Sequence, residues 1–541
     1  MTTTLSLSLV SHTNVGKTTL ARTLLARDIG EVRDEAHVTE NAESQVLIES
    51  PAGDRLLLWD TPGFGDSLRL ARRLAQAGNP IGWFLSEVWD RWRDRPFWSS
   101  QRALRHVLGE SDLVLYLVNA AEAPEDAGYL DAELQVLGLI GKPVIALLNQ
   151  LGPAGAADLD AAAEDSLTAR WRVRLAATPG VQAVLQLDAF TRCWVQEGVL
   201  WRAVAEALPL PQQAAFARLQ AAWHQRQTAI WRSAMAELAR RLARAALDAE
   251  AVEPEGWRGP LRKIGSTLGK TLGKALGWRG DTGDSPNELA MAALAERLDS
   301  DLRQSTDTLI ALHGLDGRAG SDVLEKLARH YALRQPLDEG RAALWGGVVS
   351  GALAGLKADI ASGGLTLGGG LLVGGVLGAM AAAGAARGVN LVRGLERPQL
   401  AWDARVLDAL LASALLGYLA VAHHGRGRGA WVDEAPPTRW TAAVQAVLQA
   451  RRGEIDAVWR QRVDLLGRAA TPPSPTGSGE VAGSNTAIVR ALQGLFESAS
   501  VDALVRLYPE AGAALPARGP SSRQRETSTH SSHGAGPSTP T

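Results

Sequence analysis

Short apolar runs alternate with helical patterns along residues 1–211. The segments between the runs, such as residues 18–25 and 125–139, repeat their apolar positions at helical spacing. This alternation predicts a mainly parallel sheet with helices on both faces, an α/β domain. The apolar runs, which we interpret as strands, are residues 5–10, 46–49, 56–59, 113–119, 144–148 and 181–187.

The pattern changes after Pro209 and Pro211. Apolar positions then recur at roughly 3.6-residue spacing along one long helix, which predicts an all-α domain over residues 212–468. From residue 469 onward, Pro, Ser, Gly and Thr dominate, which predicts a disordered tail over 469–541 with a helix at 488–507. The helical face is defined by Phe216, Leu219, Trp223, Ile230, Leu238 and Leu242.

Composition narrows the class of protein. A chain of 541 residues is too long for one hydrophobic core, so at least two folded units are expected. A net charge of −2 gives no overall attraction to nucleic acid, and we predict no nucleic-acid partner. Cys193 is the single cysteine, which excludes an intramolecular disulfide. With no secretory leader pattern at the start, we expect a cytoplasmic protein.

A phosphate-binding loop is predicted between the first apolar run and the first helix, the context that a Walker A motif requires. Backbone N–H groups and the helix dipole would favour phosphate there, Lys17 would add a positive charge, and Thr18 would offer its hydroxyl to Mg²⁺. Ser11 takes the place of the usual first glycine. The predicted nucleotide-binding residues are Ser11, His12, Thr13, Asn14, Val15, Gly16, Lys17, Thr18 and Thr19.

A second phosphate motif, Asp60-Thr61-Pro62-Gly63, follows the predicted strand 56–59. Asp60 would hold Mg²⁺ through water, and the Gly63 N–H would meet the γ-phosphate. Thr39 lies between the two motifs and is either a switch threonine that contacts Mg²⁺ or an ordinary surface residue. We therefore predict Lys17, Thr39 and Gly63 as catalytic residues and Thr18, Thr39 and Asp60 as magnesium ligands.

These motifs resemble those of the Era/EngA/TrmE group of P-loop GTPases. Most of the likeness lies in residues 7–149, in the strings SHTNVGKTTLARTLL, HVTENAE, LLLWDTPGFGDS, NPIGWFLSEVWDRWRDRPFW and VLYLVNAAE. The first three strings hold the nucleotide chemistry. The chain is also similar to bacterial proteins that join such a domain to a C-terminal helical domain of unknown function. The resemblance implies binding of GTP and GDP, hydrolysis of GTP to GDP and phosphate, and a potassium ion at Asn14.

The chain departs from the group at two places. Phe64 stands where Ras-like enzymes carry the glutamine that orients water, so we expect slow hydrolysis without a partner, a dimer or potassium. The base motif Asn-Lys-x-Asp is replaced by Asn149-Gln150-Leu151-Gly152, and glycine offers no carboxylate to guanine. Guanine preference is thus implied by the resemblance. The predicted base-binding residues are Asn149, Gln150, Asp188 and Ala189.

Three segments suggest a partner surface. Leu85, Val88, Trp89 and Trp92 form an aromatic helical face that suits either the domain's own core or a docking surface. Residues 257–278 are basic, and glycine recurs at every fourth position from residue 265 to residue 277. Residues 345–386 are rich in Gly and Ala, and residues 360–386 contain no charged side chain. Residues 257–278 suit either a membrane interface or a surface linker helix weakened by its glycines. Residues 345–386 suit either insertion into a membrane or a tightly packed pair of soluble helices.

Together these features predict a magnesium-dependent GTPase switch whose nucleotide state is coupled to a helical effector domain. We expect a guanine nucleotide as ligand, and we consider a homodimer and association with the inner face of the cell membrane. Two alternatives stay open: a membrane-acting mechanoenzyme, and a nucleotide-binding scaffold that hydrolyses weakly.

Overall fold

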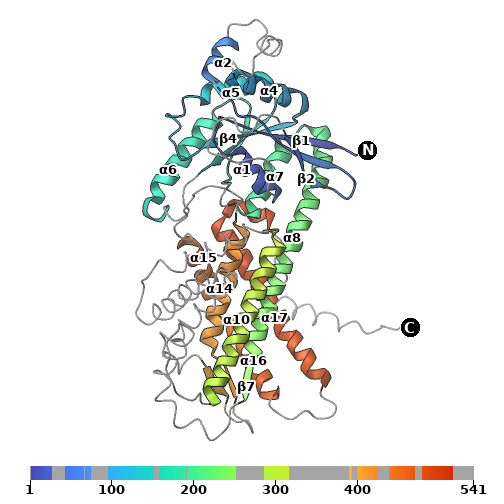
Figure 1. The fold of residues 1–541 in the computed structure, drawn as a ribbon, viewed down its shortest axis with the longest axis vertical. Coiled ribbons are helices and arrows are strands. Elements are labelled where there is room, and N and C mark those ends of the chain that lie inside the picture. Colours follow the sequence, from blue (N-terminus) through green and yellow to red (C-terminus); the bar gives the residue numbers. More distant parts are fainter. Residues whose placement is uncertain are drawn as a thin grey trace, which may run out of the picture.

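The computed structural model describes residues 2–26, 43–65, 67–74, 95–150, 157–189, 192–251, 286–315, 389–392, 399–424, 438–469 and 478–515. Figure 1 shows an α/β domain at one end of an elongated molecule and long helices that run along its longest axis. Thr39, the aromatic face at Leu85–Trp92, and residues 257–278 and 345–386 lie outside the described residues.

The α/β domain is built on a six-stranded sheet of order β2-β3-β1-β4-β5-β6, in which only β2 is antiparallel to its neighbour. The central strands are nearly continuous apolar runs because helices cover both faces. This confirms the predicted fold class. The strands are β1 (Thr4–Ser11), β2 (Glu43–Glu49), β3 (Arg55–Asp60), β4 (Leu113–Asn119), β5 (Val144–Asn149) and β6 (Val181–Gln186).

Alternate side chains of each strand enter two different cores. Leu115 and Leu117 of β4 face the core that contains α1 (Lys17–Leu25) and α7 (Trp194–Ala207). Tyr116 and Val118 face the opposite core, which holds side chains of α2 (Ser67–Leu74), α4 (Arg95–Glu110), α5 (Leu130–Ile140) and α6 (Ala157–Ala176). The sheet is thus wrapped on both sides, and its loops meet at the carboxyl edge.

The helical region is organised around α8 (Leu210–Leu247), which has 38 residues and is about 57 Å long at 1.5 Å per residue. It packs against α10 (Pro286–Leu312), α14 (Ala404–Ala422), α16 (Arg452–Ala469) and α17 (Ser478–Leu507). α15 (Thr438–Ala450) packs on α14 and α17, and the short helix η3 (Pro509–Ala514) packs on α7. One hydrophobic core continues from the sheet through α7 and α8 into this bundle.

Two sequence predictions need correction. The helix predicted at 488–507 is present within α17, but residues 478–515 are not part of a disordered tail, because Ile488, Leu492 and Phe496 of α17 are buried against the bundle. The region after α7 is not purely helical either, since β7 (Ala249–Ala251), β8 (Val389–Val392) and β9 (Gln399–Trp402) form a small antiparallel sheet. These strands were too short to produce a clear pattern in the sequence.

One described helix, α14, is long and apolar enough to cross a membrane by length and composition. Most of its apolar window, 61%, is buried inside the protein. Its buried leucines contribute to the core of the bundle, which accounts for its apolar sequence without a membrane.

Candidate functional site

The predicted phosphate loop lies where β1 ends and α1 begins. Two of its residues have left-handed backbone, Asn14 with φ 66° and Gly16 with φ 97°. Glycine is required at position 16 also for space, since a Cβ there would lie 2.8 Å from Nδ2 of Asn149. Ser11, in place of the usual glycine, has no positive φ and fits as the last residue of the strand. The substitution therefore leaves the loop intact.

Lys17 points back across this loop. Its Nζ donates hydrogen bonds to Oγ of Ser11 at 3.0 Å and to the carbonyl of His12 at 3.4 Å. The side chain is almost buried, and burial lowers the pKa of Lys17, while the carboxylates of Asp60 and Glu133 act in the opposite direction. A cation held in this place by weak neutral acceptors can exchange them for phosphate oxygens.

Asp60 and Gly63 face the same loop from the end of β3. The hydroxyl of Thr18 donates to Oδ2 of Asp60 at 2.5 Å, and a Cβ on Gly63 would meet Lys17 Nζ at 3.0 Å and Thr13 Cα at 3.1 Å. The N–H of Phe64 donates to the carbonyl of Ser11 at 2.9 Å. The two predicted phosphate motifs are therefore joined at one edge of the sheet.

This arrangement fits a nucleotide triphosphate with magnesium. A hydroxyl and a carboxylate are oxygen ligands that Mg²⁺ prefers, and Thr18 and Asp60 bring them together. The close approach at Gly63 leaves room for a backbone N–H beside Lys17, a space that any side chain would fill. Thr18 and Asp60 are the residues that would hold the metal.

The predicted base-binding residues lie beside the loop. Asn149 is buried at the end of β5, where its Nδ2 donates to the carbonyl of Val15 at 2.7 Å and its Oδ1 accepts from the N–H of Ala189 at 2.8 Å. Gln150, with φ 57°, approaches the same carbonyl at 3.5 Å. Asp188 and Ala189 follow β6 and are buried. In this structure Asn149 thus ties the phosphate loop to the segment after β6.

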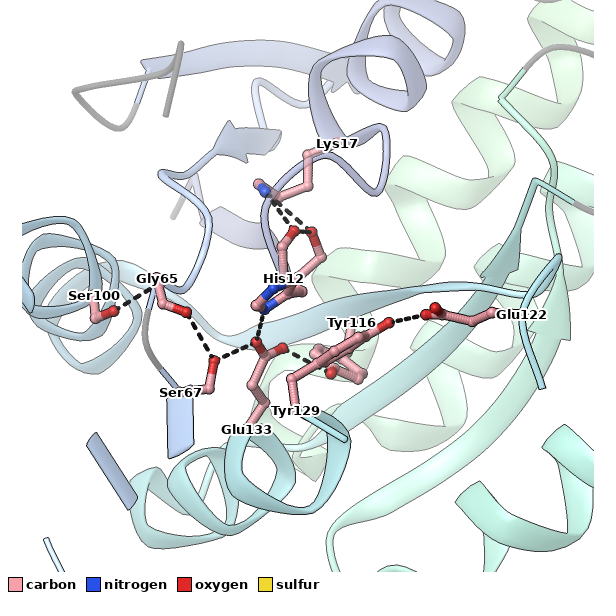
Figure 2. A network of polar contacts seen from close by, with 10 residues as sticks. His12, Lys17, Gly65, Ser67, Ser100, Tyr116, Glu122, Tyr129 and Glu133 are labelled. Atoms are coloured by element: carbon pink, nitrogen blue, oxygen red, sulfur yellow. Dashed lines mark hydrogen bonds and ion pairs between the residues drawn. The ribbon is translucent and has the colours of Figure 1, made fainter. Parts of the chain in front are cut away.

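A buried polar network adjoins the phosphate loop, as Figure 2 shows. Its centre is Glu133 of α5, which accepts hydrogen bonds from Nδ1 of His12 at 2.8 Å, the hydroxyl of Ser67 at 2.6 Å and the hydroxyl of Tyr116 at 2.8 Å. The ring of His12 also stacks on Tyr129 with centroids 4.2 Å apart. The side chain of His12 therefore points towards Glu133 on α5, while the carbonyl of His12 faces Lys17.

Sequence reasoning did not identify Glu133. The signal was present, because Glu133 interrupts the apolar face that Leu130, Leu134 and Leu137 form along α5. A carboxylate on a buried helix face requires hydrogen-bond donors around it. Phe64, by contrast, is buried in the core on the α2 and α4 side of the sheet, and offers no polar group to water.

Comparisons with known proteins agree with this geometry. Residues 6–150 match the family described as the 50S ribosome-binding GTPase, which covers less than half of the chain. Together with the fold and the joined phosphate motifs, this match defines the N-terminal region as a GTP-binding P-loop GTPase domain. No curated protein matches the chain.

Among solved structures, the chain is similar to Era in complex with MgGDPNP and nucleotides of 16S ribosomal RNA, at 17% identity and a TM-score of 0.27. This match covers 39% of the chain and 58% of that protein. Aquifex aeolicus Era bound to GDP.AlF4⁻ gives 18% identity, a TM-score of 0.27, and coverage of 38% and 57%. A bacterial selenocysteine-specific elongation factor matches at 15% identity and a TM-score of 0.25, and this match covers 38% of the chain and 29% of that protein. The chain thus spans little more than half of the two Era proteins, and TM-scores this low establish no functional relationship.

Proposed function

We propose that this protein is a magnesium-dependent GTPase switch of the Era-like kind, in which the nucleotide state of the α/β domain is coupled to the helical region. The observation that supports it best is the close approach of Gly63 to Lys17 and Thr13. This close approach supports a role of the second phosphate motif in sensing the γ-phosphate. A diphosphate would lack that group, so the segment after β3 would respond to hydrolysis.

The residues of the chain would divide the chemistry among them. Lys17 and the backbone N–H groups of the loop would bind the phosphates, and the Gly63 N–H would stabilise charge on the γ-phosphate as water attacks. Bound Mg²⁺ would neutralise phosphate charge, held by Thr18 and Asp60, with Thr39 as a further proposed ligand. Because Phe64 is buried and apolar, no side chain at that position would orient the water, and hydrolysis would be slow.

Potassium is part of this proposal. Asn14 stands in the loop with a left-handed backbone, φ 66°. A monovalent cation bound there would supply positive charge that the described residues near the γ-phosphate do not provide beyond Lys17. We propose that potassium raises turnover and that sodium does not, because the smaller ion demands a tighter shell of oxygens.

Coupling to the helical region would run through α1, α7 and α8. Arg192 donates to the carbonyl of Thr23 near the end of α1 at 2.6 Å and forms a buried ion pair with Glu197 of α7. Glu197 in turn accepts from Nε1 of Trp223 on α8 at 3.2 Å. These contacts connect the helix that follows the phosphate loop to the longest helix of the bundle. A shift of α1 would therefore be felt by α8.

A second set of contacts connects α8 to the turn between β2 and β3. Arg218 of α8 donates two hydrogen bonds, at 2.7 and 3.0 Å, to the carboxylate of Asp54 in the turn between β2 and β3. Arg218 holds the pKa of Asp54 well below its usual range. β3 ends at Asp60 of the second phosphate motif, and the segment that contains Thr39 precedes β2 in the sequence, so this turn would be another route between the nucleotide and the bundle.

We further propose a cytoplasmic location with association at the inner face of the cell membrane, supported by the sequences of residues 257–278 and 345–386. Co-sedimentation of the full chain with anionic and with neutral vesicles tests this. Binding to neither, with or without GTP, would contradict it. Self-association with GTP but not GDP would support a homodimer, and its absence would remove that proposal.

The test of the main proposal is nucleotide binding and hydrolysis by the full chain. Lys17→Ala should abolish tight GTP binding, because the phosphate charge loses its buried cation. Lys142→Ala is the matched control, since Lys142 precedes β5 at the opposite edge of the sheet from the phosphate loop. Equal GTP affinity of Lys17→Ala and Lys142→Ala would defeat the GTPase assignment.

Hydrolysis by the full chain also distinguishes the switch from the second candidate, a nucleotide-binding scaffold that hydrolyses weakly. The buried, apolar Phe64 favours the scaffold. Single-turnover hydrolysis is measured with potassium and with sodium. Hydrolysis that potassium accelerates supports the switch. Tight GTP binding with no release of phosphate in either salt supports the scaffold.

A further inference from the structure

Glu133 connects three elements of the α/β domain through one carboxylate. It is fully buried on α5, and its donors come from the phosphate loop, from the start of α2 and from β4. Among the described residues its ion-pair partner is His12. A buried carboxylate with so few opposite charges costs stability unless every oxygen is well hydrogen-bonded. A residue that only filled space at this position would be more stable with an apolar side chain.

The contacts of the two oxygens are unequal. Oε1 accepts both from His12 of the phosphate loop and from Ser67 of α2, whereas Oε2 accepts from Tyr116 of β4. One oxygen thus joins the two segments that surround the predicted γ-phosphate site. The other oxygen joins Glu133 to a strand that is fixed in the centre of the sheet.

The segment between Gly63 and Ser67 is short, so the position of Ser67 constrains that of Gly63. At its near end, the N–H of Phe64 is bonded to Ser11. Farther along, the N–H of Gly65 donates to Oγ of Ser100 on α4 at 3.1 Å. At the far end, Ser67 reaches Glu133, as Figure 2 shows. Each contact holds a different residue of the turn that carries Gly63.

We propose that Glu133 is a positioning residue for GTP hydrolysis, which sets the distance between the phosphate loop and the Gly63 turn by binding His12 and Ser67 with the same oxygen. It acts through Ser67, whose hydroxyl it holds. This inference rests on the proposed GTPase function. Loss of the Ser67 contact frees the Gly63 turn, whose N–H then meets the γ-phosphate less often in the transition state.

The chain offers a matched pair of substitutions. Ser67→Ala and Tyr116→Phe each remove one hydroxyl that donates to Glu133, and both residues are buried. Only Ser67→Ala releases the turn. A purely structural role of Glu133 would give the two variants the same effect, because each loses one hydrogen bond to the same carboxylate.

The expected result is a separation of kcat from binding. Ser67→Ala should lower kcat about tenfold, because the Gly63 N–H would lose much of its hydrogen bond to the charged γ-phosphate in the transition state. GDP affinity should change by less than about twofold. Tyr116→Phe should leave kcat within about twofold of the wild type. Glu133→Gln keeps an oxygen for His12 and Ser67, so its kcat should exceed that of Glu133→Ala.

Amide hydrogen exchange gives a readout that does not depend on catalysis. Ser67→Ala should speed exchange across Gly63 and the first turn of α2, and Tyr116→Phe should not. Equal kcat and equal exchange for the two variants would overturn the positioning role, as would a loss of GDP affinity in place of kcat. If the wild type itself does not hydrolyse GTP, the proposed function fails, and exchange alone decides whether Glu133 holds the turn.

Discussion

The sharpest consequence of the site geometry concerns Gly63→Ala. A Cβ at this position would lie 3.0 Å from Lys17 Nζ and 3.1 Å from both Cα and Cγ2 of Thr13. Lys17 could swing aside only by leaving the phosphates, and Thr13 Cα belongs to the loop backbone. The turn therefore has to retreat by a few tenths of an ångström, since carbon atoms pack at about 3.5–4.0 Å.

The retreat would weaken the contact of the Gly63 N–H with the γ-phosphate. A hydrogen bond to a charged group contributes about 1.5–3 kcal/mol, so kcat should fall between about tenfold and about a hundredfold. GDP affinity should stay within about twofold of the wild type, because GDP lacks the group that this N–H would meet. Single-turnover hydrolysis measures the rate of GTP cleavage, and competition with a fluorescent GDP analogue measures GDP affinity.

Gly138→Ala is the control for this experiment. Gly138 lies on α5, and a Cβ there would meet nothing within 4 Å. Alanine also favours a helix over glycine, so this variant should fold at least as well and hydrolyse GTP as the wild type does. If Gly63→Ala turned over GTP within about twofold of Gly138→Ala, the close approach would have no role in catalysis and our assignment of Gly63 would be refuted.

Three further predictions concern binding, stability and pH. Asn149→Ala should weaken GTP, XTP and ATP binding by similar factors, because both amide atoms of Asn149 hold protein backbone; selective loss of GTP in competition assays would contradict this. Arg192→Ala should destabilise the protein by about 3–5 kcal/mol in urea unfolding, since it strands the buried Glu197, whose pKa burial already raises, and Arg192→Ala/Glu197→Gln should recover part of that loss. Burial lowers the pKa of His423 from 6.5 to about 3, so neutral His423 is favoured in the folded protein and its stability contribution is lost as pH falls below 6.5. At pH 5 this loss is about 2 kcal/mol, and unfolding of His423→Gln should show a correspondingly weaker pH dependence between 7 and 5.

Buried hydrogen bonds connect helices within the core that the α/β domain shares with the helical bundle. Trp194 of α7 donates to the hydroxyl of Tyr418 on α14 at 3.2 Å, and Trp231 of α8 donates to Oγ of Ser500 on α17 at 3.1 Å. These bonds lie inside a core that continues from the sheet to the bundle. The α/β domain and the bundle are thus joined by packed side chains.

The sequence by itself determined the α/β domain and both phosphate motifs. The strands of the sheet are short apolar runs whose period and spacing are local properties, and Lys17, Thr18, Asp60 and Gly63 follow from their positions at strand ends. Because five of the six strands run in the same direction, the loops that follow them leave the sheet at the same, carboxyl end. For this reason the phosphate site could be predicted without coordinates.

Only the tertiary structure decided how Glu133 and α17 are used. The three donors of Glu133 lie 121, 66 and 17 positions away along the chain, and nothing local indicates that they meet. The sequence around α17 is flanked by residues typical of a tail, yet its apolar face is buried because α8 presents a matching surface. Contacts between distant segments depend on packing of the whole chain, and the apolar period of one segment does not show which other segment covers it.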